Sequence, residues 1–358
     1  MAVGTGPEEA AAALPAAADP RLPALASRRG RGEWLKTLPL YLLPQHLCSR
    51  LMYLATRARF RPWKDWQIRW FVARYGVDLG AAQTAETAAY PHFNAFFTRA
   101  LRPGARTVAG DSDAVCSPVD GTAYHAGQIE AGRLFQAKGR DYTLSELLAC
   151  DSGWVPRFMA GSYVTLYLAP RDYHRVHMPI AGRLERAIYV PGRLFAVNPR
   201  TTRVVPRLYA RNERLVSLFE TEAGPMAIVM VGALFVGNLE AVFPIPHAGP
   251  GLRVMDYDRP GTTPVWLEKG AEMGRFNMGS TVIILFGPGA VCWAPALLSH
   301  SRVRVGESIG IRGSREGRTE PARQAGMRAG NPADAPGPRT SHKELKESRS
   351  HIKACNLP

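Results

Sequence analysis

Residues 276–286 read Phe-Asn-Met-Gly-Ser-Thr-Val-Ile-Ile-Leu-Phe, and Gly287-Pro288-Gly289 follows them. The five apolar residues that end this stretch include three β-branched ones, which is typical of a buried strand. The uncharged stretch continues to Ser299 and reaches the length of a membrane span, but its glycines and prolines would break such a helix. The sequence therefore predicts a buried strand that ends in a turn.

Similar short runs recur on either side of this strand, over residues 105–312. The segments 163–168 and 227–231 are apolar or β-branched, and glycines and prolines separate such runs. Residues 34–100 instead read as helices that prolines interrupt. These expected helices span residues 34–43, 46–59, 63–75 and 93–101, with breaks at Pro44 and Pro62. The predicted fold class is α+β, with N-terminal amphipathic helices followed by a β-rich core of short, mostly antiparallel strands.

The composition is that of a globular protein with two unusual ends. Of the 358 residues, 46% are hydrophobic and 21% are charged, which allows a sizeable core and excludes a wholly disordered or fibrous chain. Residues 1–33 are rich in Ala, Pro, Gly and Arg, and residues 313–358 are basic with almost no large apolar side chain, so we expect two disordered tails. Between them we expect a helical, membrane-associating region over 34–104 and a β-rich catalytic domain over 105–312.

The positive charge is concentrated in the expected helices. The formal net charge is +15, and the segment from Arg28 to Arg74 holds eleven basic residues against two acidic ones, together with four of the seven tryptophans. Amphipathic helices that carry Trp and Leu opposite Lys and Arg suit the surface of an anionic bilayer. The alternative is a helical cap whose aromatic face packs on the β-core. We expect no nucleic-acid partner, because no nucleic-acid-binding motif accompanies the charge.

The cysteines and the N-terminus indicate a reducing compartment without a secretory signal. The five cysteines are scattered and form no C-x-x-C pair, which argues against a disulfide framework and a zinc site. Glu8 and Glu9 stand where a signal peptide would carry basic residues, and no continuous apolar stretch follows them. Membrane attachment is therefore expected to be peripheral.

Three polar clusters interrupt the β-rich region. The first is the turn around Asp120, the second holds His174 and His177 three residues apart, and the third is Gly279-Ser280 before the buried strand. Each has a plain structural interpretation: a capped turn, a structural histidine beside a surface one, and a Gly-Ser turn. The H-x-x-H spacing could also offer two metal ligands, but no third ligand is visible nearby.

Taken together, the clusters place Asp, His and Ser in one chain, and such a group requires closeness in space rather than in sequence. One hypothesis is a serine hydrolase or acyltransferase that uses Ser280, His177 and Asp120. The G-x-S-x-G nucleophile elbow is absent, which argues against it. Another hypothesis is a non-enzymatic basic scaffold on a membrane or nucleic acid.

The same motifs make the sequence resemble the phosphatidylserine decarboxylases of the proteobacterial and mitochondrial type. The resemblance covers roughly residues 40–312. Met278 replaces a leucine that is usual in this family, an apolar exchange of similar volume. The motifs that carry the resemblance are Phe93–Arg99, Ser117–Gly121, Arg171–Pro179, Tyr189–Gly192, Asn212–Arg214 and Lys269–Thr281.

The resemblance implies a proenzyme that cuts itself between Gly279 and Ser280 into chains 1–279 and 280–358. Ser280 would attack the Gly279 carbonyl, with His177 as the base and Asp120 orienting and stabilising that histidine. Elimination and hydrolysis would then convert Ser280 into a covalent pyruvoyl group, the only cofactor implied, with neither a metal nor pyridoxal phosphate.

The resemblance further implies the decarboxylation of phosphatidylserine to phosphatidylethanolamine and CO2 through a Schiff base to the pyruvoyl group. His174 is expected to donate a proton or to orient the carboxylate. The implied partners are phosphatidylserine in an anionic membrane and the small chain produced by the cut, with a homodimer of such pairs as a further expectation. The implied location is peripheral, on the cytoplasmic face of the bacterial inner membrane.

Overall fold

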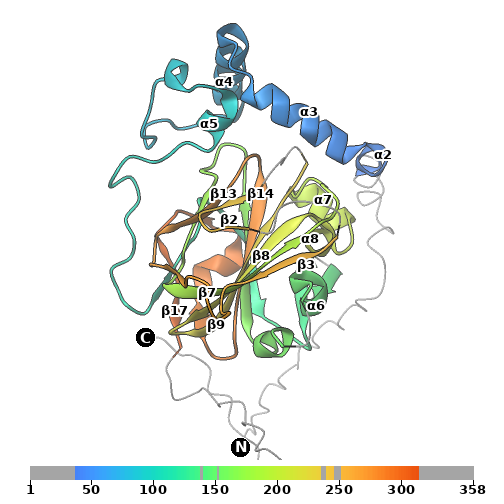
Figure 1. The fold of residues 1–358 in the computed structure, drawn as a ribbon, viewed down its shortest axis with the longest axis vertical. Helices are drawn as coiled ribbons and strands as arrows, with labels where there is room; N and C mark the ends of the chain where they lie inside the picture. The colour runs from blue at the N-terminus through green and yellow to red at the C-terminus, as the bar shows by residue number, and fades with distance from the viewer. Residues whose placement is uncertain (1–36, 138–139, 151–152, 235–238, 246–250, 314–358) are drawn as a thin grey trace, which may run out of the picture.

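A computed structural model describes residues 37–137, 140–150, 153–234, 239–245 and 251–313. The tails expected at 1–33 and 313–358 lie outside these residues, except for Gly313. Figure 1 shows helices at one end of the molecule and packed β-sheets below them. The α-helices that precede the first strand in the described residues are α2 (Pro39–Leu42), α3 (Gln45–Arg57), α4 (Arg61–Tyr75) and α5 (Phe93–Phe97).

Prolines and one glycine set the limits of the two long helices. Pro44 immediately precedes α3, and Pro62 lies in the first turn of α4, where its missing N–H has no helical partner to lose. Gly76 ends α4 with a φ of 64°, a left-handed conformation that glycine adopts without strain. Both helices match the expected ones to within two residues.

The fourth expected helix, 93–101, was predicted too long. Helix α5 ends at Phe97, and the chain beyond it leaves the helix and pairs with an earlier segment. The Ala100 carbonyl accepts a hydrogen bond from the Gln83 N–H at 2.8 Å, and Leu101 forms an antiparallel bridge with Ala82. Of the first expected helix, 34–43, residues 34–36 lie outside the described part, and α2 occupies only its end.

The core is built on one antiparallel sheet of nine strands, in which β14 is central. The order is β11–β7–β8–β9–β14–β5–β2–β16, with β12 beside β7. Every residue of β14 is buried, as its apolar sequence predicts. The strands of this sheet are β2 (Gly121–Gln128), β5 (Ser162–Leu168), β7 (Gly182–Val190), β8 (Arg214–Thr221), β9 (Gly224–Val231), β11 (Arg253–Asp256), β12 (Val265–Leu267), β14 (Ser280–Phe286) and β16 (Arg302–Val303).

The described residues also form three smaller sheets. One joins β10 (Leu239–Ala241), β13 (Glu272–Phe276) and β6 (Arg175–His177), a second joins β1 (Ala114–Cys116), β17 (Ser308–Arg312) and β15 (Val291–Trp293), and a third pairs β3 (Arg133–Ala137) with β4 (Arg140–Thr143). The short helices are α6 (Leu144–Leu148), α7 (Pro199–Val204), α8 (Leu208–Arg211), η2 (Thr87–Ala89), η3 (Val155–Phe158) and η4 (Pro295–Ser299). The α+β class with mostly antiparallel strands is confirmed.

Strand register decides which face of the large sheet carries Ser280. Val282 pairs with Met230, and alternate side chains share a face, so Ser280, Val282 and Met230 point the same way. A side chain at Gly274 of β13 would come within 3.3 Å of the Met230 sulfur. The sheet formed by β10, β13 and β6 therefore covers the face to which Ser280 belongs.

Two apolar clusters stabilise the molecule, and one residue contacts both. The larger cluster fills the space around the nine-stranded sheet, and the smaller joins α4 to α5 through residues such as Phe71, Phe93 and Phe97. Met278 packs against both clusters. The segment just before Gly279 is therefore held between the helical end and the β-core.

Candidate active site around residues 279 and 280

Ser280 begins the central strand in a fully enclosed position. It pairs with Leu168 of β5, its exposed fraction is 0%, and its Oγ has no hydrogen-bond partner. A buried hydroxyl normally finds a partner, because leaving it unpaired costs about 1–3 kcal/mol. The orphaned Oγ beside the Gly279 peptide therefore indicates a site that keeps a nucleophile free.

His174 lies next to that peptide. It occupies the loop between β5 and β6 and is fully buried, with its ring packed against Phe97 at 4.1 Å between centroids and a tilt of 42°. Its Nδ1–H donates to the Asp172 carbonyl at 2.8 Å, so the lone pair is on Nε2, which has no partner. A Cβ built at Gly279 would lie 4.0 Å from this Nε2.

Burial sets the basicity of His174. Desolvation lowers the pKa of this imidazole to about 3, with a smaller opposite effect from its hydrogen bond to Asp172. The Arg99 guanidinium lowers the pKa of His174 further, and the Asp120 carboxylate raises it. His174 is therefore neutral at physiological pH, with a free Nε2 beside the Gly279–Ser280 bond.

His177, at the end of β6, has both ring nitrogens occupied. Its Nδ1–H donates to the Gly270 carbonyl at 2.8 Å, and its Nε2 accepts from the Tyr173 hydroxyl at 3.0 Å. Burial lowers the pKa of His177, while the bond to Gly270 and the nearby Glu272 carboxylate act in the opposite direction. In the uncut chain His177 is hydrogen bonded to neither Ser280 nor Asp120.

Asp120 is held by a different set of partners. Its carboxylate forms a two-pronged ion pair with Arg106, including an Nε–Oδ1 bond of 3.0 Å, and accepts the Val305 N–H at 2.9 Å. It acts on His174 and His177 through its charge, which raises the pKa of both imidazoles. The structure thus brings His174, Gly279 and Ser280 together, and keeps Asp120 and His177 near them without direct bonds.

Helix α5 connects the histidine loop to the segment before Gly279. The Asn94 amide donates to the Asn277 side-chain oxygen at 2.8 Å, and the Asn277 amide donates to Glu240 at 2.9 Å. Beyond α5, the Thr98 carbonyl accepts from Arg175 Nε at 2.9 Å. The sequence motif from Phe93 to Arg99 signalled this segment, but sequence analysis assigned no site role to Arg99 or to Arg106.

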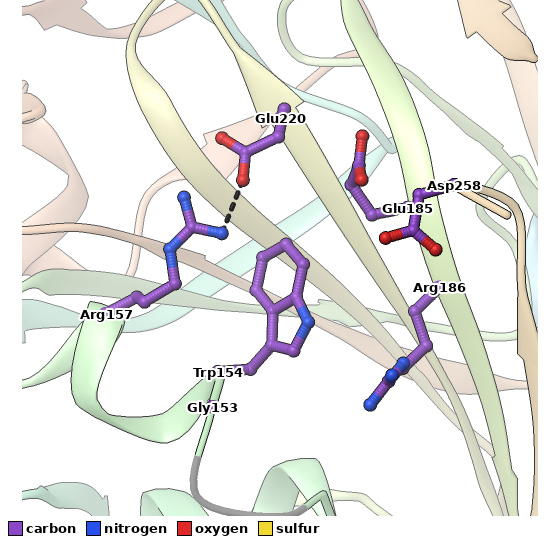
Figure 2. A pocket seen from close by; sticks show the side chains of 7 residues that line it. All are labelled: Gly153, Trp154, Arg157, Glu185, Arg186, Glu220 and Asp258. Carbon is purple, nitrogen blue, oxygen red and sulfur yellow. Dashed lines mark ion pairs between the residues drawn. The ribbon is translucent and has the colours of Figure 1, made fainter. Parts of the chain in front are cut away.

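A separate pocket lies away from these residues. It is lined by Gly153, Trp154, Arg157, Glu185, Arg186, Glu220 and Asp258. Figure 2 shows the Trp154 indole between an ion pair of Arg157 with Glu220 and the carboxylates of Glu185 and Asp258. It contains none of the residues that the sequence predicted.

Among the residues that the structure describes, no three His, Cys, Asp or Glu side chains gather as a set that could hold a metal ion. Over the same residues, no helix combines the length and the apolar character needed to cross a bilayer.

Comparison with known families gives a direct match. The family model described as phosphatidylserine decarboxylase matches residues 93–311, which include α5, both histidines and the Gly279–Ser280 bond. The chain belongs to the phosphatidylserine decarboxylase family. A second family model, described as PSD, matches residues 35–76. The resemblance to phosphatidylserine decarboxylases that the motifs predicted is therefore confirmed.

Curated relatives extend the phosphatidylserine decarboxylase match over most of the chain. Each of the following is called a phosphatidylserine decarboxylase proenzyme. That of Pseudomonas fluorescens is 50% identical over 273 residues, which are 76% of this chain and 95% of the relative. That of Pseudomonas paraeruginosa is 52% identical over 273 residues, 76% of this chain and 94% of the relative, and that of Pseudomonas putida is 50% identical over 271 residues, 75% and 94% respectively.

Proposed function

We propose that this protein is a carboxy-lyase that converts phosphatidylserine to phosphatidylethanolamine and CO2, after cutting itself between Gly279 and Ser280. Membership of the family supports the reaction, and the name proenzyme, shared by the relatives, supports the cut. The observation that carries the site assignment is the pair of orphaned buried atoms, Ser280 Oγ and His174 Nε2, beside one peptide bond.

The cut requires no external reagent except water. Ser280 Oγ attacks the Gly279 carbonyl carbon and its proton passes to a base, the C–N bond breaks, and the acyl group moves from nitrogen to oxygen as an ester. Loss of the Ser280 α-proton then expels the Gly279 carboxylate and leaves dehydroalanine. Water hydrolyses this group, ammonia leaves, and residue 280 becomes a pyruvoyl group at the start of the chain 280–358.

The surroundings of residue 280 fit such a group. The position is dry, the neighbouring Gly279 has no side chain to obstruct it, and Ser280 Oγ is free of competing bonds. The ketone of the group would supply an electrophile for the substrate amine and an acceptor for the electron pair that remains when CO2 leaves. The dry site favours the loss of a carboxylate charge, because water that would stabilise the charged form is excluded.

We assign the cleavage base to His177, as the motif match suggests, although His174 is nearer to Gly279 in the uncut chain. A base works best when its pKa is near the ambient pH, and a histidine with a pKa of about 3 holds a proton poorly. Burial lowers the pKa of His177 as well, but its hydrogen bond to Gly270 and the Glu272 carboxylate oppose that shift. This role requires His177 Nε2 to leave the Tyr173 hydroxyl, with the Asp120 charge favouring the protonated form that results.

His174 is then the residue that handles a proton during decarboxylation. Its free Nε2 already faces residue 279, and Phe97 and the Asp172 carbonyl fix its ring. An anionic substrate beside it would raise its pKa and allow it to hold a proton that it then delivers.

The helical end supplies a surface for the membrane that holds the substrate. Leu47, Leu51 and Leu54 share one face of α3 and are more than half exposed, and three tryptophans are aligned in the same way on α4. Trp66 stacks on Trp63 at 5.3 Å and on Trp70 at 6.4 Å between ring centroids. Large exposed apolar patches mark interaction sites, and this one is flanked by exposed arginines.

We infer peripheral attachment to the cytoplasmic face of a bacterial inner membrane. Basic segments are attracted to anionic lipid headgroups by about 1 kcal/mol per charge, and the α3–α4 segment carries such charges. The processed enzyme would contain both chains of the cut, and two such pairs could assemble as a dimer. The amine of phosphatidylserine then enters from the bilayer surface.

Mass spectrometry of the purified protein tests the proposal. We expect two chains that correspond to 1–279 and 280–358, the second without a free N-terminal amine, together with release of CO2 from phosphatidylserine. Ser280→Ala should remain a single chain of the intact mass and release no CO2. An intact wild-type chain that still decarboxylates the lipid would refute the cut, and labelling of an intact chain at Ser280 by a fluorophosphonate would favour a serine hydrolase instead.

A further inference from the structure

Arg99 is a buried cation without a matching anion. Its exposed fraction is 5%, and its Nε has no hydrogen-bond partner. The guanidinium makes one long bond, from Nη2 to the Arg171 carbonyl at 3.4 Å, and lies 5.5 Å from the centre of the Phe96 ring. No Asp or Glu of the described residues forms an ion pair with it, which is unusual because an unpaired buried charge costs several kcal/mol.

The carboxylates of Asp120, Asp172 and Glu272, which lie near the site, are already paired with other arginines. Asp120 is paired with Arg106, and Arg175 with Glu272 at 2.8 Å. Asp172 is paired with Arg302 at 2.7 Å. A guanidinium offers five N–H donors, and Arg99 uses one of them weakly, so the site holds an unfilled position for an anion.

Arg99 lies close to His174. It is two residues beyond Phe97, whose ring packs against His174, and it bonds to the loop that carries His174. Its charge is felt by His174, whose pKa it lowers. An anion bound at Arg99 would therefore lie beside the imidazole that faces residue 279.

Phosphatidylserine brings two anionic groups to this place, a carboxylate and a phosphodiester. The carboxylate loses its charge as CO2 departs, so a cation bound to it would stabilise the substrate more than the transition state and slow the reaction. The phosphodiester keeps its charge throughout, and a cation bound to it strengthens binding without raising the barrier. The chemistry therefore favours the phosphodiester.

We propose that Arg99 binds the phosphodiester of the lipid headgroup and so fixes the serine amine and carboxylate at residue 280. This inference rests on the proposed decarboxylase function. A second possible anion is the Gly279 carboxylate that the cut itself would create, and the experiment separates the two.

The experiment compares processed wild-type enzyme with Arg99→Gln, Arg99→Lys and the exposed neighbour Arg102→Gln, using phosphatidylserine in mixed detergent micelles. Loss of a charged hydrogen bond predicts a KM about tenfold or more higher for Arg99→Gln, with kcat changed less than about threefold. Arg99→Lys should lie between this variant and wild type, and Arg102→Gln should match wild type. Wild-type activity in the same assay establishes the proposed function independently.

Soluble probes identify the anion without relying on a variant. Glycerophosphoglycerol, a phosphodiester with neither amine nor carboxylate, should inhibit wild-type enzyme competitively, whereas lactate at equal concentration should not. Arg99→Gln should lose this inhibition. If glycerophosphoglycerol fails to inhibit active wild-type enzyme, the proposal is refuted, whether or not the variants fold.

Two other results with Arg99→Gln would overturn the proposal. The Arg99→Gln change could lower the melting temperature of the cut enzyme by more than it lowers that of the uncut Ser280→Ala protein, while KM stays unchanged. In that case Arg99 pairs with the Gly279 carboxylate, and the proposal is wrong. If Arg99→Gln lowers kcat with KM unchanged, Arg99 acts on the reacting carboxylate or on His174, which also overturns it.

Discussion

At the scale of single residues, the two histidines differ because of their partners rather than their type. Both imidazoles carry a proton on Nδ1, fixed by a backbone carbonyl, so each directs Nε2 towards other groups. The Nε2 of His174 is unpaired beside Gly279, and that of His177 accepts from Tyr173. One side chain is thus ready for chemistry in the uncut chain, while the other must first exchange a bond.

Substitution of each histidine separates their roles. We expect His177→Ala to remain an uncut chain, because it loses the base of the cleavage, and His174→Ala to be cut but to decarboxylate about a hundredfold or more slowly. Denaturing gels and CO2 release measure the two steps. If His177→Ala is cut at the normal rate and His174→Ala is not cut, the cleavage base is His174. The proposed decarboxylase function would not be affected by that result.

The low pKa of His174 predicts a loss of stability in acid. Its pKa is about 3 in the folded chain and about 6.5 in the unfolded one. Between these values the unfolded chain binds a proton that the folded chain does not, so stability falls as the pH falls, by up to about 1.4 kcal/mol per pH unit. His174→Gln in the uncut Ser280→Ala protein should therefore make the free energy of unfolding depend less on pH.

Urea unfolding at pH 6.5 and pH 5 measures this effect. Between pH 6.5 and pH 5 the free energy of unfolding should decrease in both proteins. The decrease should be smaller in the His174→Gln protein than in its parent, by up to about 2 kcal/mol. Equal slopes in the His174→Gln protein and its parent would show that His174 does not titrate in this window.

At the scale of elements, α3 and α4 direct apolar residues outward, whereas β14 buries them. Trp63, Trp66 and Trp70 recur at helical spacing on the outer side of α4, opposite Ile68 and Phe71, which enter the smaller apolar cluster. The sequence left open whether the aromatic face covers the β-core or faces outward. The structure decides for the outward face, since the tryptophans are 40–52% exposed.

A pair of tryptophans tests the membrane surface. Trp66 on α4 and Trp266 on β12 are each 52% exposed, so they differ in place rather than in exposure. We expect Trp66→Ala to weaken binding to vesicles that contain phosphatidylserine by about tenfold or more, because insertion of an aromatic side chain contributes about 1.5–3 kcal/mol. Trp266→Ala should bind as wild type in the same sedimentation assay, and equal losses in both variants would count against an α3–α4 docking surface.

At the scale of the whole molecule, the Gly279–Ser280 bond lies where a cut leaves the fold interleaved. The chain after the cut would contribute β14 to the large sheet, between β5 and β9, and β16 beside β2. It would also contribute β17 beside β1. The two products would share two sheets and one apolar core, and Met278 would remain near the junction of both apolar clusters.

The shared sheets predict that the two chains stay together. After processing they should co-elute in gel filtration at the volume of the uncut Ser280→Ala protein, or at that of a dimer of it. They should separate only in denaturant, because removing β14 exposes seven fully buried residues. A small chain that elutes alone from native buffer would contradict the interleaved arrangement.

The sequence by itself determined the elements and the family. The apolar run before Gly287 specified a buried strand, Pro44 and Pro62 marked helix breaks, and the motifs indicated the decarboxylase resemblance. These features are local, because strand and helix patterns and short motifs are written in neighbouring residues. Where the prediction failed, at residues 98–101, pairing with residues 82–83 overrode the local helical pattern.

Only the tertiary structure determined which groups of the site contact one another. It placed His174 beside Gly279, gave Asp120 to Arg106 and the Val305 N–H, and buried Arg99 without an anion. These facts depend on contacts between residues far apart in the chain and on the water that those contacts exclude. Burial and pairing, rather than residue type, set the pKa of a polar group and decide whether it is free to react. The chemistry of this site is therefore a property of the folded chain.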